Sequence, residues 1–146
     1  MHVYLGADHR GYQLKVQIIN WLSSLQIPFT DFGANEFNAE DDYNDFARKV
    51  AEAILRNPGD ESFGVLACGS GQGMCMQANR YKGVRAAICH DTTEAVETRG
   101  HNNANVICIS ADTVGNHYAD ILEAFFNTKP LPDERYSRRC QKLDEV

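Results

Sequence analysis

The stretch Phe63-Gly-Val-Leu-Ala-Cys-Gly-Ser-Gly-Gln-Gly73 says most about how this chain folds. An apolar, strand-like run ends in Cys68, glycines follow at positions 69, 71 and 73, and a helix-like stretch continues to Ala78-Asn79-Arg80. A glycine-rich turn between a strand and a helix aims several backbone N–H groups at one point, where the helix dipole adds positive potential. Such a turn suits an anion, or an oxygen that becomes negative during a reaction. A plain turn beside an inert, buried cysteine is the alternative, and three alternating glycines make it the weaker one.

Strand-like and helix-like segments alternate on both sides of this stretch. Strands are expected at 3–6, 28–33, 63–67, 84–88 and 105–109, and helices at 12–25, 43–55, 72–81, 91–99 and 114–126. Five such alternations predict an α/β fold, a doubly wound, Rossmann-like, five-stranded parallel sheet with helices on both faces. A charged C-terminal helix is expected over 133–146. The chain is therefore predicted to form a single domain over residues 1–146.

Composition excludes several classes of partner. The chain has 146 residues, of which 43% are hydrophobic and 23% charged, as in soluble globular domains. Its net charge of −6 disfavours nucleic acid and acidic membranes as partners. Five unevenly spaced cysteines and an opening without a signal peptide predict free thiols in a reducing, cytoplasmic compartment. No apolar run is long enough to span a bilayer, and no metal site or other cofactor is expected.

Polar residues gather where the expected strands end. Ligands of doubly wound folds bind beyond the carboxyl ends of the strands, and this chain places Asp8-His9, Cys68-Gly69-Ser70 and His90-Asp91 there. Cys68 faces a helix N-terminus, which predicts a lowered thiol pKa and a reactive thiolate. Asp8 and His9 suit a hydroxyl or an anionic group, and a helix cap beside a surface histidine is an equal alternative.

Two further candidates lie outside those strand ends. His101 falls in the polar segment 99–105, where a turn is expected, and it is a candidate general acid or base. An exposed, inert histidine is the alternative. Arg135 and Arg139 are four residues apart in the tail, so on a helix they share a face that suits a phosphate. A solvated basic stretch is the alternative for this pair.

Together these residues resemble the ribose-5-phosphate isomerase B family, which includes the galactose-6-phosphate isomerases. Each matching segment is weakly specific, but their order and separations along essentially the whole chain are highly specific. The segments are Gly6-Ala7-Asp8-His9-Arg10-Gly11, Asp42-Tyr43, Cys68-Gly69-Ser70-Gly71-Gln72-Gly73, Ala78-Asn79-Arg80, Gly83-Val84-Arg85-Ala86, His101-Asn102-Asn103-Ala104-Asn105-Val106 and the pair Arg135 and Arg139.

The resemblance implies a metal-independent aldose–ketose isomerase that converts ribose 5-phosphate to ribulose 5-phosphate by ring opening and an enediolate. Cys68 would then be the proton-abstracting base, His101 would assist ring opening, and Ser70 would help to move the proton. The enediolate oxygen would be held by backbone N–H groups of Gly69, Ser70, Gly71, Gln72 and Gly73. Sugar hydroxyls would be contacted by Asp8, Tyr43 and Asn102. The phosphate would be held by His9, Arg135 and Arg139. The family's pocket lies at a dimer interface, so the resemblance implies a homodimer or a dimer of dimers whose tail over 133–146 contacts the partner subunit.

Two positions bear on how closely the family pattern is kept. Some members use a glutamate just after the glycine loop, whereas this chain has Met74, which cannot act as a base and so favours Cys68. Many members carry an arginine after the fifth strand, near the phosphate, whereas Asp112 lies in or beside that place here. A carboxylate that faced the pocket there would repel a phosphate.

Other functions stay open at this point. The chain could isomerise another sugar, either a hexose 6-phosphate or a free aldose. It could instead be a phosphate- or nucleotide-binding module, although its loop lacks the Lys-Ser/Thr of a P-loop and follows the third strand. A non-catalytic partner of an active subunit is a further alternative, against which Cys68, His101 and the arginine pair argue. Neither the sugar nor the choice between dimer and tetramer follows from the sequence.

Overall fold

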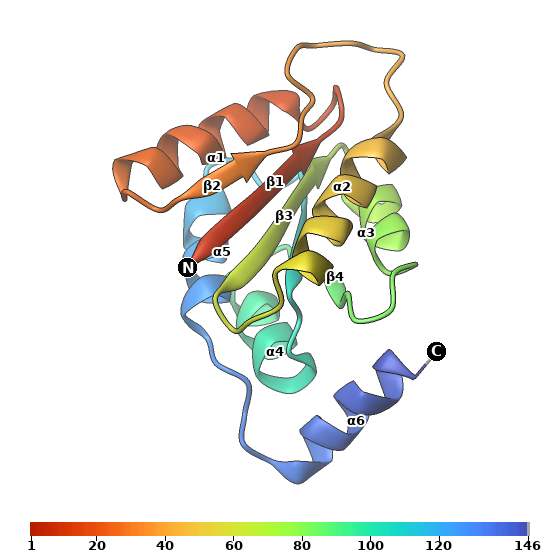
Figure 1. The fold of residues 1–146 in the computed structure, drawn as a ribbon. Helices are drawn as coiled ribbons and strands as arrows, with labels where there is room; N and C mark the ends of the chain where they lie inside the picture. Colours follow the sequence, from red (N-terminus) through yellow and green to blue (C-terminus); the bar gives the residue numbers. More distant parts are fainter. Residues whose placement is uncertain (146) are drawn as a thin grey trace.

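A five-stranded sheet forms the centre of the computed structural model, which describes residues 1–145. Its strands are β1 (His2–Ala7), β2 (Phe29–Asp31), β3 (Ser62–Cys68), β4 (Ala86–Ile88) and β5 (Val106–Ser110). They are hydrogen-bonded in the order β2-β1-β3-β5-β4, and every neighbouring pair is parallel (Figure 1). The chain leaves β1 for β2 on one side and continues through β3 on the other. In doubly wound folds such a reversal marks the usual place for a ligand, here beyond the carboxyl ends of β1 and β3.

Helices cover both faces of the sheet, and this confirms the predicted doubly wound fold. The helices are α1 (Tyr12–Ser24), α2 (Tyr43–Arg56), α3 (Gln72–Ala78), α4 (Thr92–Asn102), α5 (Tyr118–Asn127) and α6 (Glu134–Asp144). One core lies between the sheet and α1, α4 and α5, and the other lies under α2 and α3. Because side chains alternate along β3, Val65 and Ala67 enter the first core while Leu66 and Cys68 enter the second. The thiol of Cys68 therefore faces the α2 and α3 side.

Helix α4 is longer than the sequence pattern indicated. Asp91 begins it as expected, since its Oδ1 accepts a hydrogen bond of 2.8 Å from the Glu94 backbone N–H. The helix then continues past the expected end near Arg99 to Asn102, and Asn103 ends it with a left-handed φ of 47°. His101 consequently lies in the last turn of a helix, and the prediction of a polar turn at this position was wrong.

Helix α5 is shorter than expected. It begins at Tyr118 rather than at Val114, because the preceding segment forms turns in which Gly115 has a φ of 54°.

The structure also bears on the expectations about cysteines and membrane spans. All five cysteines are unpaired. Within residues 1–145, the helices are too short or too polar to cross a bilayer.

Helix α6 lies beside α4, apart from the sheet (Figure 1). None of its residues from Glu134 to Asp144 is buried. Its contacts to the rest of the chain include an ion pair of 2.8 Å between Arg85 and Asp144 and a stack of the Tyr136 ring on His101, with ring centroids 4.7 Å apart. An expected helix over the tail is thus confirmed for residues 134–144, while Val146 lies outside the described residues. A helix without buried side chains gains little stability from its own chain.

Candidate active site

The buried thiol of Cys68 lies directly against the glycine turn. Cys68 is the last residue of β3 and is 5% exposed. Its Sγ accepts a hydrogen bond of 3.1 Å from the backbone N–H of Gly71. Gly71 has a φ of 77°, a left-handed conformation that favours glycine, and it begins α3. The turn therefore folds back over the thiol and points at least one N–H group at it.

The environment of Cys68 raises its pKa. Burial is the largest cause, because it disfavours the charged thiolate. Hydrogen bonds from the backbone N–H groups of Gly71, Met74 and Ser70 oppose this effect, and the nearby carboxylate of Asp8 adds to it. The prediction of a lowered thiol pKa was wrong, because loss of water around the thiol outweighs the N–H groups at the start of α3. Burial therefore favours the neutral form of this thiol.

Asp8 and His9 lie at the end of β1, next to this turn in the sheet. Asp8 is 6% exposed, and its Oδ1 accepts a hydrogen bond of 2.9 Å from the Gly11 N–H at the start of α1. The Nδ1 atom of His9 lies 2.6 Å from Oδ1 of Asp41. Asp8 therefore closes the turn that precedes α1 and does not cap the helix, whose N-cap is Gly11, while His9 is held in place by a carboxylate.

Asp41 was not singled out from the sequence, where it is one of several acidic residues before α2. Its Oδ1 also accepts a hydrogen bond of 3.1 Å from the His9 backbone N–H, and its buried Oδ2 has no partner among the described residues. Asp8, His9 and Asp41 place ligand atoms within 4.8 Å of one another, the spacing that a metal ion would require. Within this cluster, His9 Nδ1 and Asp41 Oδ1 already pair with each other at 2.6 Å.

Tyr43, the first residue of α2, lies against the first turn of α3, beside the glycine turn. Its ring lies over Gly73, where an added Cβ would come within 2.7 Å of the ring. Glycine at this position thus permits the close approach of Tyr43. The exposed Ser70 hydroxyl accepts a hydrogen bond of 3.3 Å from the Gln72 N–H and remains accessible.

The remaining predicted site residues lie at the opposite edge of the sheet. Helix α4 runs from the carboxyl end of β4 back to the amino end of β5, so His101 and Asn102 lie at the amino edge. There the His101 ring stacks on Tyr136 of α6, the helix that also carries Arg135 and Arg139. The resemblance implied one site containing both Cys68 and His101, but within a single chain the two lie at opposite edges of the sheet. One chain carries two separate groups, which we call the carboxyl-edge group (Asp8, His9, Tyr43, Cys68, Ser70) and the amino-edge group (His101, Asn102, Arg135, Arg139).

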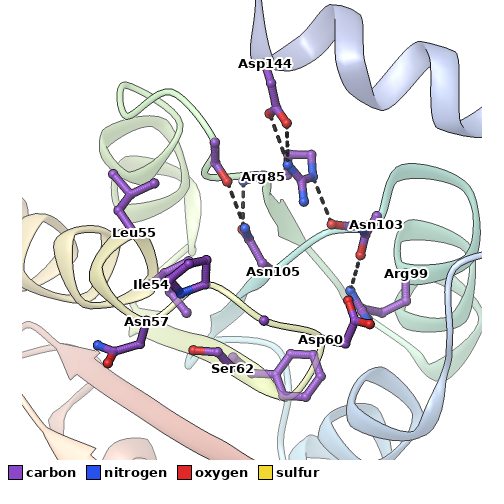
Figure 2. A pocket seen from close by; sticks show the side chains of 14 residues that line it. Ile54, Leu55, Asn57, Asp60, Ser62, Arg85, Arg99, Asn103, Asn105 and Asp144 are labelled. Atoms are coloured by element: carbon purple, nitrogen blue, oxygen red, sulfur yellow. Dashed lines mark hydrogen bonds and ion pairs between the residues drawn. The ribbon is translucent and has the colours of Figure 1, made fainter.

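A cavity of about 290 Å³ lies next to the amino-edge group (Figure 2). Arg85 and Arg99 line it, but both guanidinium groups are occupied. Arg85 binds Asp144 of α6 and the backbone oxygen of Asn103 at 2.9 Å. Arg99 binds the side chain of Asn103 at 2.8 Å. These bonds connect α6 to the end of α4, so the residues around the cavity hold the amino-edge group in position.

A comparison with known protein families identifies the chain. Residues 3–143 match the family model described as Ribose/Galactose Isomerase. The chain belongs to the ribose/galactose isomerase family.

Similar proteins cover nearly the whole of this family member. A probable ribose-5-phosphate isomerase B from Mycoplasma genitalium is 38% identical over 143 residues, which are 97% of this chain and 93% of the relative. The crystal structure of a ribose 5-phosphate isomerase from Thermotoga maritima has a TM-score of 0.92 at 38% identity and covers 99% of this chain and 98% of its own. The Mycoplasma genitalium enzyme has also been solved with bound ribulose 5-phosphate, with a TM-score of 0.91, 37% identity and coverage of 99% and 94%.

This isomerase-family chain carries an ion pair at the place where the sequence departed from the family pattern. Asp112 follows β5, and its carboxylate pairs with the guanidinium group of Arg10, which follows β1. Asp112 thus lies at the carboxyl edge, as its position predicted, but its charge is matched by an arginine 102 residues earlier in the chain. The sequence did not indicate this pairing.

Proposed function

We propose that this protein is a metal-independent isomerase that interconverts ribose 5-phosphate and ribulose 5-phosphate. The observation that carries the proposal is the thiol of Cys68 at the end of β3, hydrogen-bonded at 3.1 Å by the glycine turn. Removal of a proton next to a carbonyl requires a base and donors for the oxygen that becomes negative, and this turn offers both. The ribulose 5-phosphate bound to the Mycoplasma genitalium relative supports the choice of substrate.

The proposed reaction has two stages. His101 first assists opening of the sugar ring by moving a proton between the ring oxygen and the neighbouring hydroxyl. The thiolate of Cys68 then takes the proton from the carbon next to the carbonyl, N–H groups from residues 69–73 stabilise the enediolate oxygen, and the thiol returns a proton to the former carbonyl carbon. Ser70 helps to move the proton between the two oxygens. Asp8, Tyr43 and Asn102 contact sugar hydroxyls, and His9, Arg135 and Arg139 bind the phosphate.

We propose that two subunits build each site. Within one chain the carboxyl-edge and amino-edge groups lie at opposite ends of the sheet, too far apart to act on one small sugar. In a homodimer, or in a dimer of dimers, the amino-edge group of one subunit meets the carboxyl-edge group of its partner. The exposed α6 supports this arrangement, since residues 134–144 bury no side chain against their own chain. Residues 1–146 then act as one domain whose tail over 133–146 contacts the partner subunit.

An isomerase assay with a panel of sugars tests this function. Ribose 5-phosphate, hexose 6-phosphates and free aldoses are each incubated with the protein in EDTA, and conversion to the ketose is measured. We expect turnover of ribose 5-phosphate that EDTA does not reduce. Loss of turnover in EDTA would contradict the metal-independent mechanism. Faster conversion of a hexose 6-phosphate or a free aldose would assign the other substrate, and phosphate binding without turnover would indicate a binding module.

Replacement of His101 tests the ring-opening role. We expect His101→Asn to reduce turnover of a cyclic sugar phosphate about 100-fold or more, because general acid–base catalysis contributes roughly 100- to 10,000-fold. Turnover of a sugar phosphate that cannot cyclise should fall far less, since that substrate needs no ring opening. Steady-state rates on the two substrates are compared, and equal losses on both would refute this role.

Replacement of Arg139 tests the phosphate clamp. A charge-assisted hydrogen bond contributes roughly 1.5–3 kcal/mol, so Arg139→Ala should raise KM about ten- to a hundredfold. The change in kcat should be smaller if the bond is equally strong in the ground and transition states. Inorganic phosphate should inhibit the parent enzyme competitively and the variant more weakly. Unchanged inhibition, together with equal turnover of unphosphorylated sugars, would exclude a phosphate clamp and favour an isomerase of free sugars.

A further inference from the structure

The carboxyl edge of the sheet carries little positive charge of its own. The five loops that follow the strands span residues 8–11, 32–42, 69–71, 89–91 and 111–117, all of which the structure describes. Arg10 is the single arginine or lysine in these loops. Lys15, in the first turns of α1, is buried, and its ammonium group lies 2.7 Å from Asp31. A phosphate that reached this edge would therefore meet one available guanidinium group from this chain.

Arg10 lies directly over the glycine turn beside Cys68. A Cβ atom on Gly69 would come within 2.3 to 2.6 Å of three atoms of the Arg10 guanidinium group. Glycine at position 69 thus permits the guanidinium plane to lie close to the backbone between the catalytic thiol and Ser70. A larger residue at position 69 would displace Arg10.

Asp112 holds Arg10 in this place. Its carboxylate pairs with Nη2 of Arg10, and its backbone N–H donates a hydrogen bond of 3.1 Å to the carbonyl of Gly69. The hydroxyl of Ser110 donates a second bond of 2.7 Å to the same carbonyl. The segment that carries Asp112 is thus bonded to Gly69, the residue over which the Arg10 guanidinium group lies.

The charges around Arg10 indicate its ligand. The Arg10 side chain is 56% exposed, and a guanidinium group has five N–H donors, of which one, on Nη2, binds Asp112. The carboxylates of Asp8, Asp41 and Asp112 lie at the same edge and repel an anion. A guanidinium group pairs with phosphate through two parallel hydrogen bonds, which a solvated lysine does not reproduce.

We infer that Arg10, held over Gly69 by Asp112, binds the phosphate group of the substrate on the subunit that supplies Cys68. The inference rests on the proposed function, and it adds a cation from the thiol's own subunit to the arginines that α6 of the partner supplies. Asp112 is a positioning residue for Arg10 and contributes no contact to the phosphate. The carboxylate of Asp112 is thereby compatible with an anionic substrate, because it pairs with Arg10 and orients it.

Arg10→Gln tests the inference. We expect KM for ribose 5-phosphate, and the inhibition constant of inorganic phosphate, to rise together by about ten- to a hundredfold, the range expected for loss of a charge-assisted bond. The value of kcat should stay within a few-fold, and Arg10→Lys should restore part of the affinity. Arg56→Gln is the control, because Arg56 is also exposed and paired, with Glu52, but at the far end of α2. It should leave both constants unchanged.

Asp112→Asn and the double variant separate positioning from repulsion. If Asp112 orients Arg10, Asp112→Asn raises KM severalfold, and adding it to Arg10→Gln changes KM no further. A lower KM in Asp112→Asn would overturn the positioning role. A fall in kcat at constant KM in Arg10→Gln would overturn phosphate binding and place the guanidinium group at the reacting oxygens instead.

Failure of the inference can be distinguished from failure of the proposed function. If the parent protein isomerises no sugar phosphate, the proposed function fails, while titration calorimetry with inorganic phosphate still reports whether Arg10→Gln weakens binding. If the parent is active and folded Arg10→Gln keeps its KM and its phosphate inhibition, the inference is overturned. Circular dichroism and gel filtration confirm that each variant keeps the parent's fold and assembly.

Discussion

Cys68→Ser is expected to reduce turnover of ribose 5-phosphate about 100- to 10,000-fold, the usual contribution of a general base. Serine is close to cysteine in size, so the 5%-exposed site at the end of β3 should accept it without loss of the fold. Its hydroxyl is a far weaker base than a thiol. The measurement is kcat on purified variants whose circular dichroism and melting curves match the parent.

Cys75→Ser is the matched control for this variant. Cys75 lies one helix turn into α3, is half-buried, and donates to the carbonyl of Ala86 at 3.4 Å, away from the glycine turn. We expect it to keep activity within a few-fold of the parent. Near-normal activity in folded Cys68→Ser would remove the thiol from the mechanism, and equal losses in both variants would indicate a structural effect.

Alkylation supplies a second measurement on the same thiol. Because burial raises the pKa of Cys68, the thiolate forms only as the pH rises above neutral. Inactivation by an alkylating reagent should therefore accelerate about tenfold per pH unit below that pKa, and bound substrate should protect the enzyme. Fast inactivation that does not change between pH 6 and 8 would show instead that the thiolate is already formed at rest.

The second large effect is recovery of activity from two inactive variants. Cys68→Ser disables the carboxyl-edge group and His101→Asn disables the amino-edge group. If each site combines one group from each subunit, a mixed dimer has one site with both defects and one intact site. Random mixing of equal amounts makes half of the dimers mixed, so activity should return to roughly a quarter of the parent level.

Co-expression with two different affinity tags isolates the mixed dimer for this test. The purified mixed dimer should have about half of the parent's kcat per dimer, one intact site out of two. The double variant Cys68→Ser/His101→Asn mixed with the parent is the control, because its mixed dimers contain two sites with one defect each and should be inactive. A mixed dimer that stays inactive would mean that both groups act within one chain.

Local sequence determined the fold and the carboxyl-edge half of the candidate site. The β3 stretch, its glycine turn and the first turns of α3 are contiguous, so the apolar run and the glycines at 69, 71 and 73 were enough to place Cys68 under backbone N–H groups. The alternation of strands and helices was likewise sufficient for the parallel sheet. Both follow from short-range backbone geometry, which depends on neighbouring residues.

Tertiary structure decided what depends on distant segments. His101 and Asn102 lie at the amino edge because they directly precede β5, so the residues implied to form one site fall into two groups on a single chain. The balance between burial and N–H donors at Cys68 set the direction of its pKa shift, because burial depends on packing from both faces. The pairs Arg10–Asp112 and His9–Asp41 join loops after different strands, and strand order alone brings those loops together. No local pattern encodes such pairs, since the residues meet only when the sheet has formed.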